Sequence, residues 1–148
     1  MLQVLFVCEH NSARSQMAEA FLKHLGRDDF FVESCGLEAG TLNPLVIEVM
    51  DEIGYDLKNN TTQAALDLFK KGRSYDVVIT VCSQKASELC PLFPGRALRL
   101  NWPFADPSRL EGDRETKLAG IRKIRDQIKM QVEAFLAEYR HKGLKMFL

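Results

Sequence analysis

The sequence predicts an α/β fold with three layers, in which helices cover both faces of a four-stranded, parallel, doubly wound sheet. Two observations carry this prediction. Short, continuously apolar runs alternate along the chain with segments whose apolar residues recur at helical spacing. Apolar runs without polar alternation are typical of parallel strands that are buried on both faces. We therefore expect right-handed crossovers between the strands and a site beyond their carboxyl ends.

The expected elements follow one another with a turn signal at most junctions. Asn43 offers an N-cap with Pro44 at the first helical position, and Gly26, Gly54 and Gly72 each follow a helical pattern. In order, we expect strand 2–7, helix 16–25, strand 30–35, helix 44–53, a helix over 65–71 capped by residues 59–62, strand 76–81, a short helix that breaks into a loop over 83–95, strand 97–101 and helix 113–140.

The helix expected over residues 113–140 carries one apolar stripe. The stripe consists of Leu118, Ile121, Ile124, Ile128, Val132, Phe135, Leu136 and Tyr139. The charged residues between these positions are more typical of a solvated face than of a binding patch.

Length and composition restrict the class of protein. The 148 residues, 46% of them hydrophobic and 27% charged, suit one globular domain over residues 1–148. Lys plus Arg equals Asp plus Glu at 20 each, without a basic tract, so we expect neither a nucleic acid nor a membrane as partner. The apolar run over residues 2–7 is too short for a secretion signal or a membrane span. We expect a cytoplasmic monomer.

The cysteines and histidines give no metal-binding pattern. Cysteines in a cytoplasmic protein are more often catalytic, redox-active or buried than joined in structural disulfides. The chain has no C-x2-C, and His10, His24 and His141 lack the spacing of metal ligands. We therefore expect no metal site, and we interpret Cys35, at the end of a strand, as a packed small residue.

One stretch carries a pattern typical of anion chemistry, the segment 8–15 between the first strand and the first helix. Its backbone N–H groups can surround a tetrahedral anion, the helix N-terminus adds its dipole, and Arg14 adds a bidentate donor. The same field stabilises the thiolate form of Cys8, which makes it a candidate nucleophile. The anion-binding candidates are Glu9, His10, Asn11, Ser12, Ala13 and Arg14, with His10 interpreted as scaffolding and not as a base.

The C-x5-R spacing is weak by itself, because residues 90–96 match it as well. That second copy holds two prolines, lacks a following serine and leads into a strand, so no helix N-terminus would face an anion there. The first copy has the required context, and its alternative is a buried cysteine at a strand end. Cys8, Cys82 and Asp106 each come after a different strand, so we expect them at one edge of the sheet.

Three stretches resemble the thioredoxin-coupled arsenate reductases, which share the fold of the low-molecular-weight tyrosine phosphatases. They are V-L-F-V-C-E-H-N-S-A-R-S-Q-M-A-E at residues 4–19, the pair Cys82 and Cys90, and N-W-P-F-A-D-P-S at residues 101–108. The likeness spans nearly the whole chain. It implies that Cys8 is the nucleophile, Arg14 the oxyanion clamp, Ser15 the hydroxyl that stabilises the thiolate, Asp106 the general acid, and Cys82 and Cys90 the relay cysteines.

The resemblance also implies a mechanism. The Cys8 thiolate attacks arsenate while Asp106 protonates the departing oxygen. Cys82 then attacks the Cys8 sulfur, arsenite leaves, and Cys90 resolves the disulfide to give a Cys82–Cys90 bridge that thioredoxin reduces.

Two positions depart from the family pattern. Glu9 puts a carboxylate inside the anion-binding loop, so its side chain must point outward or be paired. Some relatives hold a potassium ion on residues that match Asn11, Glu19 and Ser34, but Gln63 stands here in place of a further carboxylate. We therefore expect no cofactor, with this potassium site left open.

Other functions compete with arsenate reduction. A cysteine phosphatase acting on phosphotyrosine or a small phosphomonoester needs only Cys8, Arg14 and Asp106 and leaves the relay cysteines idle. We expect such hydrolysis as a weak side activity. A binding module for anions or phosphoproteins needs neither a thiolate nor an acid, and Asp106 before a proline is also an ordinary turn residue.

Overall fold

The computed structural model describes residues 1–147 and contains a wholly parallel sheet in the strand order β2-β1-β3-β4. The strands are β1 (Leu2–Cys8), β2 (Phe30–Gly36), β3 (Val77–Thr80) and β4 (Leu98–Asn101). Because β1 lies inside the sheet between β2 and β3, its carboxyl end, which carries Cys8, is surrounded by the loops that follow its neighbours. The predicted doubly wound fold is confirmed.

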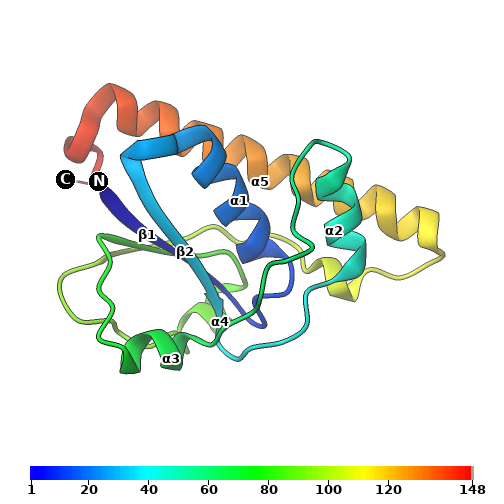
Figure 1. The fold of residues 1–148 in the computed structure, drawn as a ribbon, viewed down its shortest axis with the longest axis horizontal. Coiled ribbons are helices and arrows are strands. Elements are labelled where there is room, and N and C mark those ends of the chain that lie inside the picture. The colour runs from blue at the N-terminus through cyan, green and yellow to red at the C-terminus, as the bar shows by residue number, and fades with distance from the viewer. Residues whose placement is uncertain (148) are drawn as a thin grey trace.

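The helices cover both faces of the sheet (Figure 1). They are α1 (Arg14–Gly26), α2 (Pro44–Asp51), α3 (Ala65–Lys70), α4 (Gln84–Ser87) and α5 (Arg114–Lys142), with short 3-10 turns η1 (Arg27–Asp29), η2 (Pro107–Arg109) and η3 (Gly143–Phe147). Figure 1 shows α1, α2 and α5 together above the sheet and α3 below it. Within residues 1–147, no helix is both long and apolar enough to span a membrane.

Side chains of β1 point alternately into two buried clusters. Val4, Phe6 and Cys8 belong to the larger cluster, beneath α1, α2 and α5. Leu5 and Val7 belong to the smaller cluster, on the face that α3 covers. The alternation therefore determines which reactive side chains share a side of the sheet. The α5 stripe is buried in the larger cluster as predicted, except that Tyr139 is only partly buried.

Capping explains where most helices begin. The Asn43 side chain accepts a hydrogen bond from Leu45 N at 3.0 Å, with Pro44 at the first helical position as predicted. The prediction that residues 59–62 cap α3 is wrong. The helix begins after Ala64 without a side-chain cap, because Thr62 Oγ1 donates instead to the Gly40 carbonyl at 2.6 Å.

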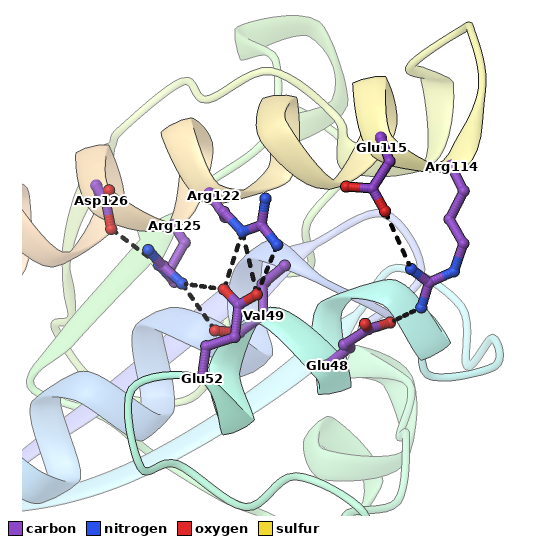
Figure 2. A network of polar contacts seen from close by, with 8 residues as sticks. All are labelled: Glu48, Val49, Glu52, Arg114, Glu115, Arg122, Arg125 and Asp126. Atoms are coloured by element: carbon purple, nitrogen blue, oxygen red, sulfur yellow. Dashed lines mark hydrogen bonds and ion pairs between the residues drawn. The ribbon is translucent and has the colours of Figure 1, made fainter.

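The charged face of α5 is solvated as predicted except at Arg125, where it faces α2, and two further arginines beside it form ion pairs with α2 (Figure 2). Arg125 is buried and donates to the Val49 carbonyl at 2.8 Å and to Glu52 at 3.0 Å. Arg122 donates to both carboxylate oxygens of Glu52, and Arg114 pairs with Glu48. These contacts hold α2, and with it the end of the segment that follows β2, against α5.

Candidate active site

The loop between β1 and α1 is held from outside by backbone hydrogen bonds. The carbonyls of Cys8, Glu9, His10 and Ser12 accept from the backbone N–H groups of residues 37, 38, 40 and 43 at 2.9 to 3.1 Å. Four loop carbonyls are therefore engaged from outside, while the N–H group of Asn11 points to the Cys8 sulfur. Gly36 permits this close approach, since a Cβ at that position would lie 2.6 Å from Asn11 N.

Buried polar groups contact the Cys8 sulfur. Cys8 Sγ lies 2.9 Å from Ser15 Oγ and accepts from Asn11 N at 3.2 Å. Asn11 has a positive φ of 55°, and its Nδ2 donates to Ser15 Oγ at 2.8 Å and to Ser34 Oγ at 3.0 Å. The Asn11 amide therefore fixes the hydroxyl that contacts the nucleophile, and Ser15 stands where the sequence placed it.

Arg14 and Asp106 meet at the mouth of the loop. The Arg14 side chain is 6% exposed, its Nη1 donates to the Phe104 carbonyl at 3.0 Å, and its Nη2 lies 3.7 Å from Asp106 Oδ2. Asp106 Oδ1 accepts from Ser108 N at 2.9 Å and caps η2. One oxygen thus makes the turn while the other faces the guanidinium, so the turn interpretation of Asp106 and the acid interpretation are compatible.

Glu9, the carboxylate inside the anion-binding loop, is paired with a cation. Its Oε2 lies 3.9 Å from Arg109 Nη2, and Arg109 Nε lies 3.6 Å from Asp106 Oδ2. Four charged groups of alternating sign, Arg14, Asp106, Arg109 and Glu9, therefore follow one another across the mouth of the site. The side chain of His10 is half exposed and points toward Glu38, at 3.9 Å, so only its backbone belongs to the loop.

The relay candidates lie on different sides of the sheet. Cys82 is fully buried in the cluster that contains Cys8, whereas Cys90 is buried in the opposite cluster with Cys35. All four cysteines are free thiols. The structure thus brings Cys82, but not Cys90, to the side of the nucleophile.

Burial dominates the acidity of these thiols. It raises the pKa of Cys82 to about 11, against the opposing effect of the Arg14 guanidinium. It also raises the pKa of Cys90, where Arg99 opposes it, and raises that of Cys35 still further. Each of these three thiols is held in its neutral form in the folded, reduced protein.

The residues that match the potassium ligands of relatives are engaged in other contacts. Glu19 accepts from Lys23 Nζ and from Ser34 Oγ, and Asn11 Oδ1 accepts from Gln63 N at 3.1 Å. The Lys23 ammonium therefore neutralises the Glu19 carboxylate in this arrangement. Within residues 1–147, no group of three or more His, Cys, Asp or Glu residues could hold a metal ion.

Sequence reasoning missed two contributors to the site. The Phe104 carbonyl, which accepts from Arg14, is a backbone group of a loop, so the pattern of residue types does not reveal it. Arg109 follows Asp106 by three residues across a proline turn, a spacing that brings two side chains together in a helical turn and could have identified it.

Comparisons with known proteins agree with this geometry. The family described as low molecular weight phosphotyrosine protein phosphatase matches residues 3–145. An arsenate reductase of Shouchella clausii is 38% identical over 133 residues, which are 89% of this chain and 93% of that protein. A solved arsenate reductase in the oxidized state has 34% identity and a TM-score of 0.78, and covers 93% of this chain and 98% of its own.

One further relative is described as dependent on thioredoxin. The Corynebacterium glutamicum thioredoxin-dependent arsenate reductase is 28% identical with a TM-score of 0.72, and the match covers 95% of this chain and 62% of that one. A family match over nearly the whole chain, together with relatives above 30% identity, shows the relationship directly. The chain belongs to the low molecular weight phosphotyrosine protein phosphatase family, among the members that include the bacterial arsenate reductases.

Proposed function

We propose that this chain reduces arsenate to arsenite with Cys8 as nucleophile and Cys82 and Cys90 as a disulfide relay that thioredoxin regenerates. The observation that carries the proposal is the placement of Cys82, a free thiol buried in the same cluster as Cys8 and within electrostatic range of both Cys8 and Arg14. Hydrolysis of a phosphomonoester does not require a second thiol there. The relatives described as arsenate reductases support the same substrate.

The first step uses the loop, the clamp and the acid. Arsenate binds to the N–H groups of the loop and to Arg14, and the Cys8 thiolate attacks arsenic. A sulfur–arsenic bond forms, one oxygen leaves as water with a proton from Asp106, and arsenic stays in its pentavalent state. Cys8 Sγ contacts the Ser15 hydroxyl and the Asn11 N–H, which hold the sulfur in place for this step.

The second step transfers two electrons. Cys82, as thiolate, attacks the Cys8 sulfur, and a Cys8–Cys82 disulfide forms as the sulfur–arsenic bond breaks. The electron pair of that bond stays on arsenic, which leaves as arsenite. Because the reduced Cys82 has a raised pKa, its deprotonation is the demanding part of this step.

The third step requires movement. A disulfide needs Cα atoms within about 7 Å and side chains directed at each other, whereas Cys82 and Cys90 are buried in different clusters. The segment over residues 83–95 therefore rearranges, so that the Cys90 thiolate can attack Cys82, release Cys8 and present the new disulfide to thioredoxin. In this scheme the protein acts as a monomer without a cofactor, and Lys23 neutralises Glu19 beside the loop.

Hydrolysis of phosphomonoesters is a second candidate function at the same site. Cys8, Arg14 and Asp106 form a complete set for attack on a phosphate ester and for protonation of its leaving group. Without an oxidation-state change the relay thiols take no part. We propose this hydrolysis as a weak side activity.

Serine variants of the relay cysteines test the proposal. Cys82→Ser and Cys90→Ser should each abolish arsenate-dependent NADPH oxidation with thioredoxin and its reductase, but leave hydrolysis of 4-nitrophenyl phosphate within about twofold, because only the first step survives. Mass mapping after one turnover should find a Cys8–Cys82 disulfide in the Cys90 variant and a Cys82–Cys90 disulfide in the unmodified chain.

Cys35→Ser is the matched control, a buried thiol in the same cluster as Cys90 without a proposed role. It should retain coupled turnover. Full thioredoxin-coupled turnover by both relay variants would contradict the relay and move phosphomonoester hydrolysis ahead as the main function.

A further inference from the structure

Arg109 is a second cation at the mouth of the anion loop. It ends η2, the turn that Asp106 caps, and its side chain is 78% exposed. Its Nε lies 3.6 Å from Asp106 Oδ2, the same oxygen that lies 3.7 Å from Arg14 Nη2. One carboxylate therefore separates the buried guanidinium from the exposed one.

Arg109 can compensate the negative charge of Glu9. A carboxylate directly after the nucleophile repels a bound dianion unless a cation compensates its charge. Arg109 Nη2 lies 3.9 Å from Glu9 Oε2, close enough to compensate the charge but longer than a hydrogen bond. Both contacts of Arg109 leave its N–H groups free to turn toward a stronger acceptor, because ion pairs of exposed side chains contribute little.

We propose that Arg109 is a specificity-determining residue that binds the departing oxygen of a free inorganic oxyanion and so favours it over an ester. Asp106 is placed to protonate the departing oxygen, so that oxygen lies on the side of the site that Arg109 faces. In arsenate or inorganic phosphate this oxygen accepts a charge-assisted hydrogen bond from the guanidinium. In a phosphomonoester the same oxygen carries the organic group and offers a weaker acceptor.

The surroundings of Arg109 favour the same distinction. Together with Glu9, His10, Glu38, Lys85 and Leu89 it lines a cavity of about 510 Å³ beside the loop. An aryl group leaving the loop in this direction meets charged side chains, whose desolvation opposes binding, beside the apolar Leu37, Ala86 and Leu89. The inference rests on the proposed function only in naming arsenate as the physiological anion.

The test separates binding of the free anion from turnover of the ester. Inorganic phosphate is titrated by calorimetry into the unmodified chain and into Arg109→Gln, and hydrolysis of 4-nitrophenyl phosphate is measured for both. We expect Arg109→Gln to raise the Kd of phosphate about tenfold, the loss of one charge-assisted hydrogen bond. The KM of the ester should change less than twofold, and Arg109→Lys should recover part of the phosphate affinity.

Two controls assign the effect to direct contact. In a Glu9→Gln background, Arg109→Gln should still raise the Kd of phosphate at least about threefold, because the contact to the anion remains to be lost. Lys85→Gln removes another cation from the same cavity and should leave the Kd within twofold.

Disappearance of the loss in the Glu9→Gln background would show that Arg109 only compensates Glu9, and it would overturn the proposal. An equal loss for phosphate and ester, or an equal effect of Lys85→Gln, would overturn it as well. Phosphate binding is measured without arsenate or thioredoxin, so failure of the reductase assignment would leave these outcomes readable.

Discussion

At the scale of single residues, the Cys8 sulfur is contacted by neutral groups. Cys8 Sγ contacts the Ser15 hydroxyl and a backbone N–H, and the Asn11 amide holds that hydroxyl in place. These contacts engage no cation, so Arg14, which is buried beside the same loop, remains available for an anion. Changes of Cys8 and of Arg14 can therefore be tested separately.

Changes of Cys8 and Arg14 should abolish chemistry and preserve the fold. Cys8→Ser replaces the thiolate by a hydroxyl that is not ionised near neutral pH, so reduction of arsenate and hydrolysis of an aryl phosphate should both fall to background. Arg14→Lys should lose at least about 100-fold in kcat/KM, since an ammonium cannot make the bidentate contact. Circular dichroism should match the unmodified chain; near-normal arsenate reduction by Cys8→Ser would contradict the assignment of the nucleophile.

Asp106→Asn tests proton donation apart from the turn. The amide can still accept the hydrogen bond from Ser108 N, so the turn should persist. We expect the first covalent step to slow by about 10²- to 10⁴-fold, the usual contribution of a positioned acid. Aryl phosphates with more acidic leaving groups should lose least in pre-steady-state rate. A loss independent of leaving-group pKa would show that Asp106 only shapes the turn.

At the scale of elements, local signals were sufficient for the strands and for most helix starts. Apolar runs located all four strands to within two residues, and Asn43-Pro44 located the start of α2. The cap of α3 was misplaced because Thr62 bonds across the chain to Gly40, a contact between segments that no local pattern contains. The same reason hid the contact of Arg14 with the Phe104 carbonyl, 90 residues away.

The interhelical arginine Arg125 should matter for stability and not for chemistry. Arg125→Met removes the donor to the Val49 carbonyl and one partner of Glu52, while the hydrophobic stem is largely kept. We expect the free energy of unfolding to fall by about 1–3 kcal/mol, the cost of leaving a buried acceptor without its donor. Urea unfolding measures it, and Lys123→Met, exposed on the same helix, is the control that should stay within about 0.5 kcal/mol.

At the scale of the whole molecule, the sheet separates the relay thiols. Cys82 and Cys90 are eight residues apart in the sequence, and sequence reasoning placed Cys82 with Cys8 and Asp106 at one edge of the sheet. Their burial in opposite clusters depends on how the segment after β3 folds over the sheet, which is decided by packing with Cys35, Tyr75 and Phe93. The fold thus keeps Cys90 buried on the side of the sheet opposite to Cys8 and Cys82.

Burial of Cys82 should make the second step of the proposed relay sensitive to alkali. Its pKa of about 11 leaves only a small fraction as thiolate near pH 7, and that fraction rises tenfold with each pH unit until the pKa is approached. In single-turnover mixing of arsenate with the Cys90→Ser variant, which should stop at the Cys8–Cys82 disulfide, arsenite release should therefore accelerate about tenfold per unit between pH 7 and 9. Hydrolysis of 4-nitrophenyl phosphate by the same variant does not involve Cys82 and should lack this rise. An arsenite-release rate that is flat over this range would mean that Cys82 leaves its buried site before it attacks, so that movement of the segment over residues 83–95 precedes electron transfer.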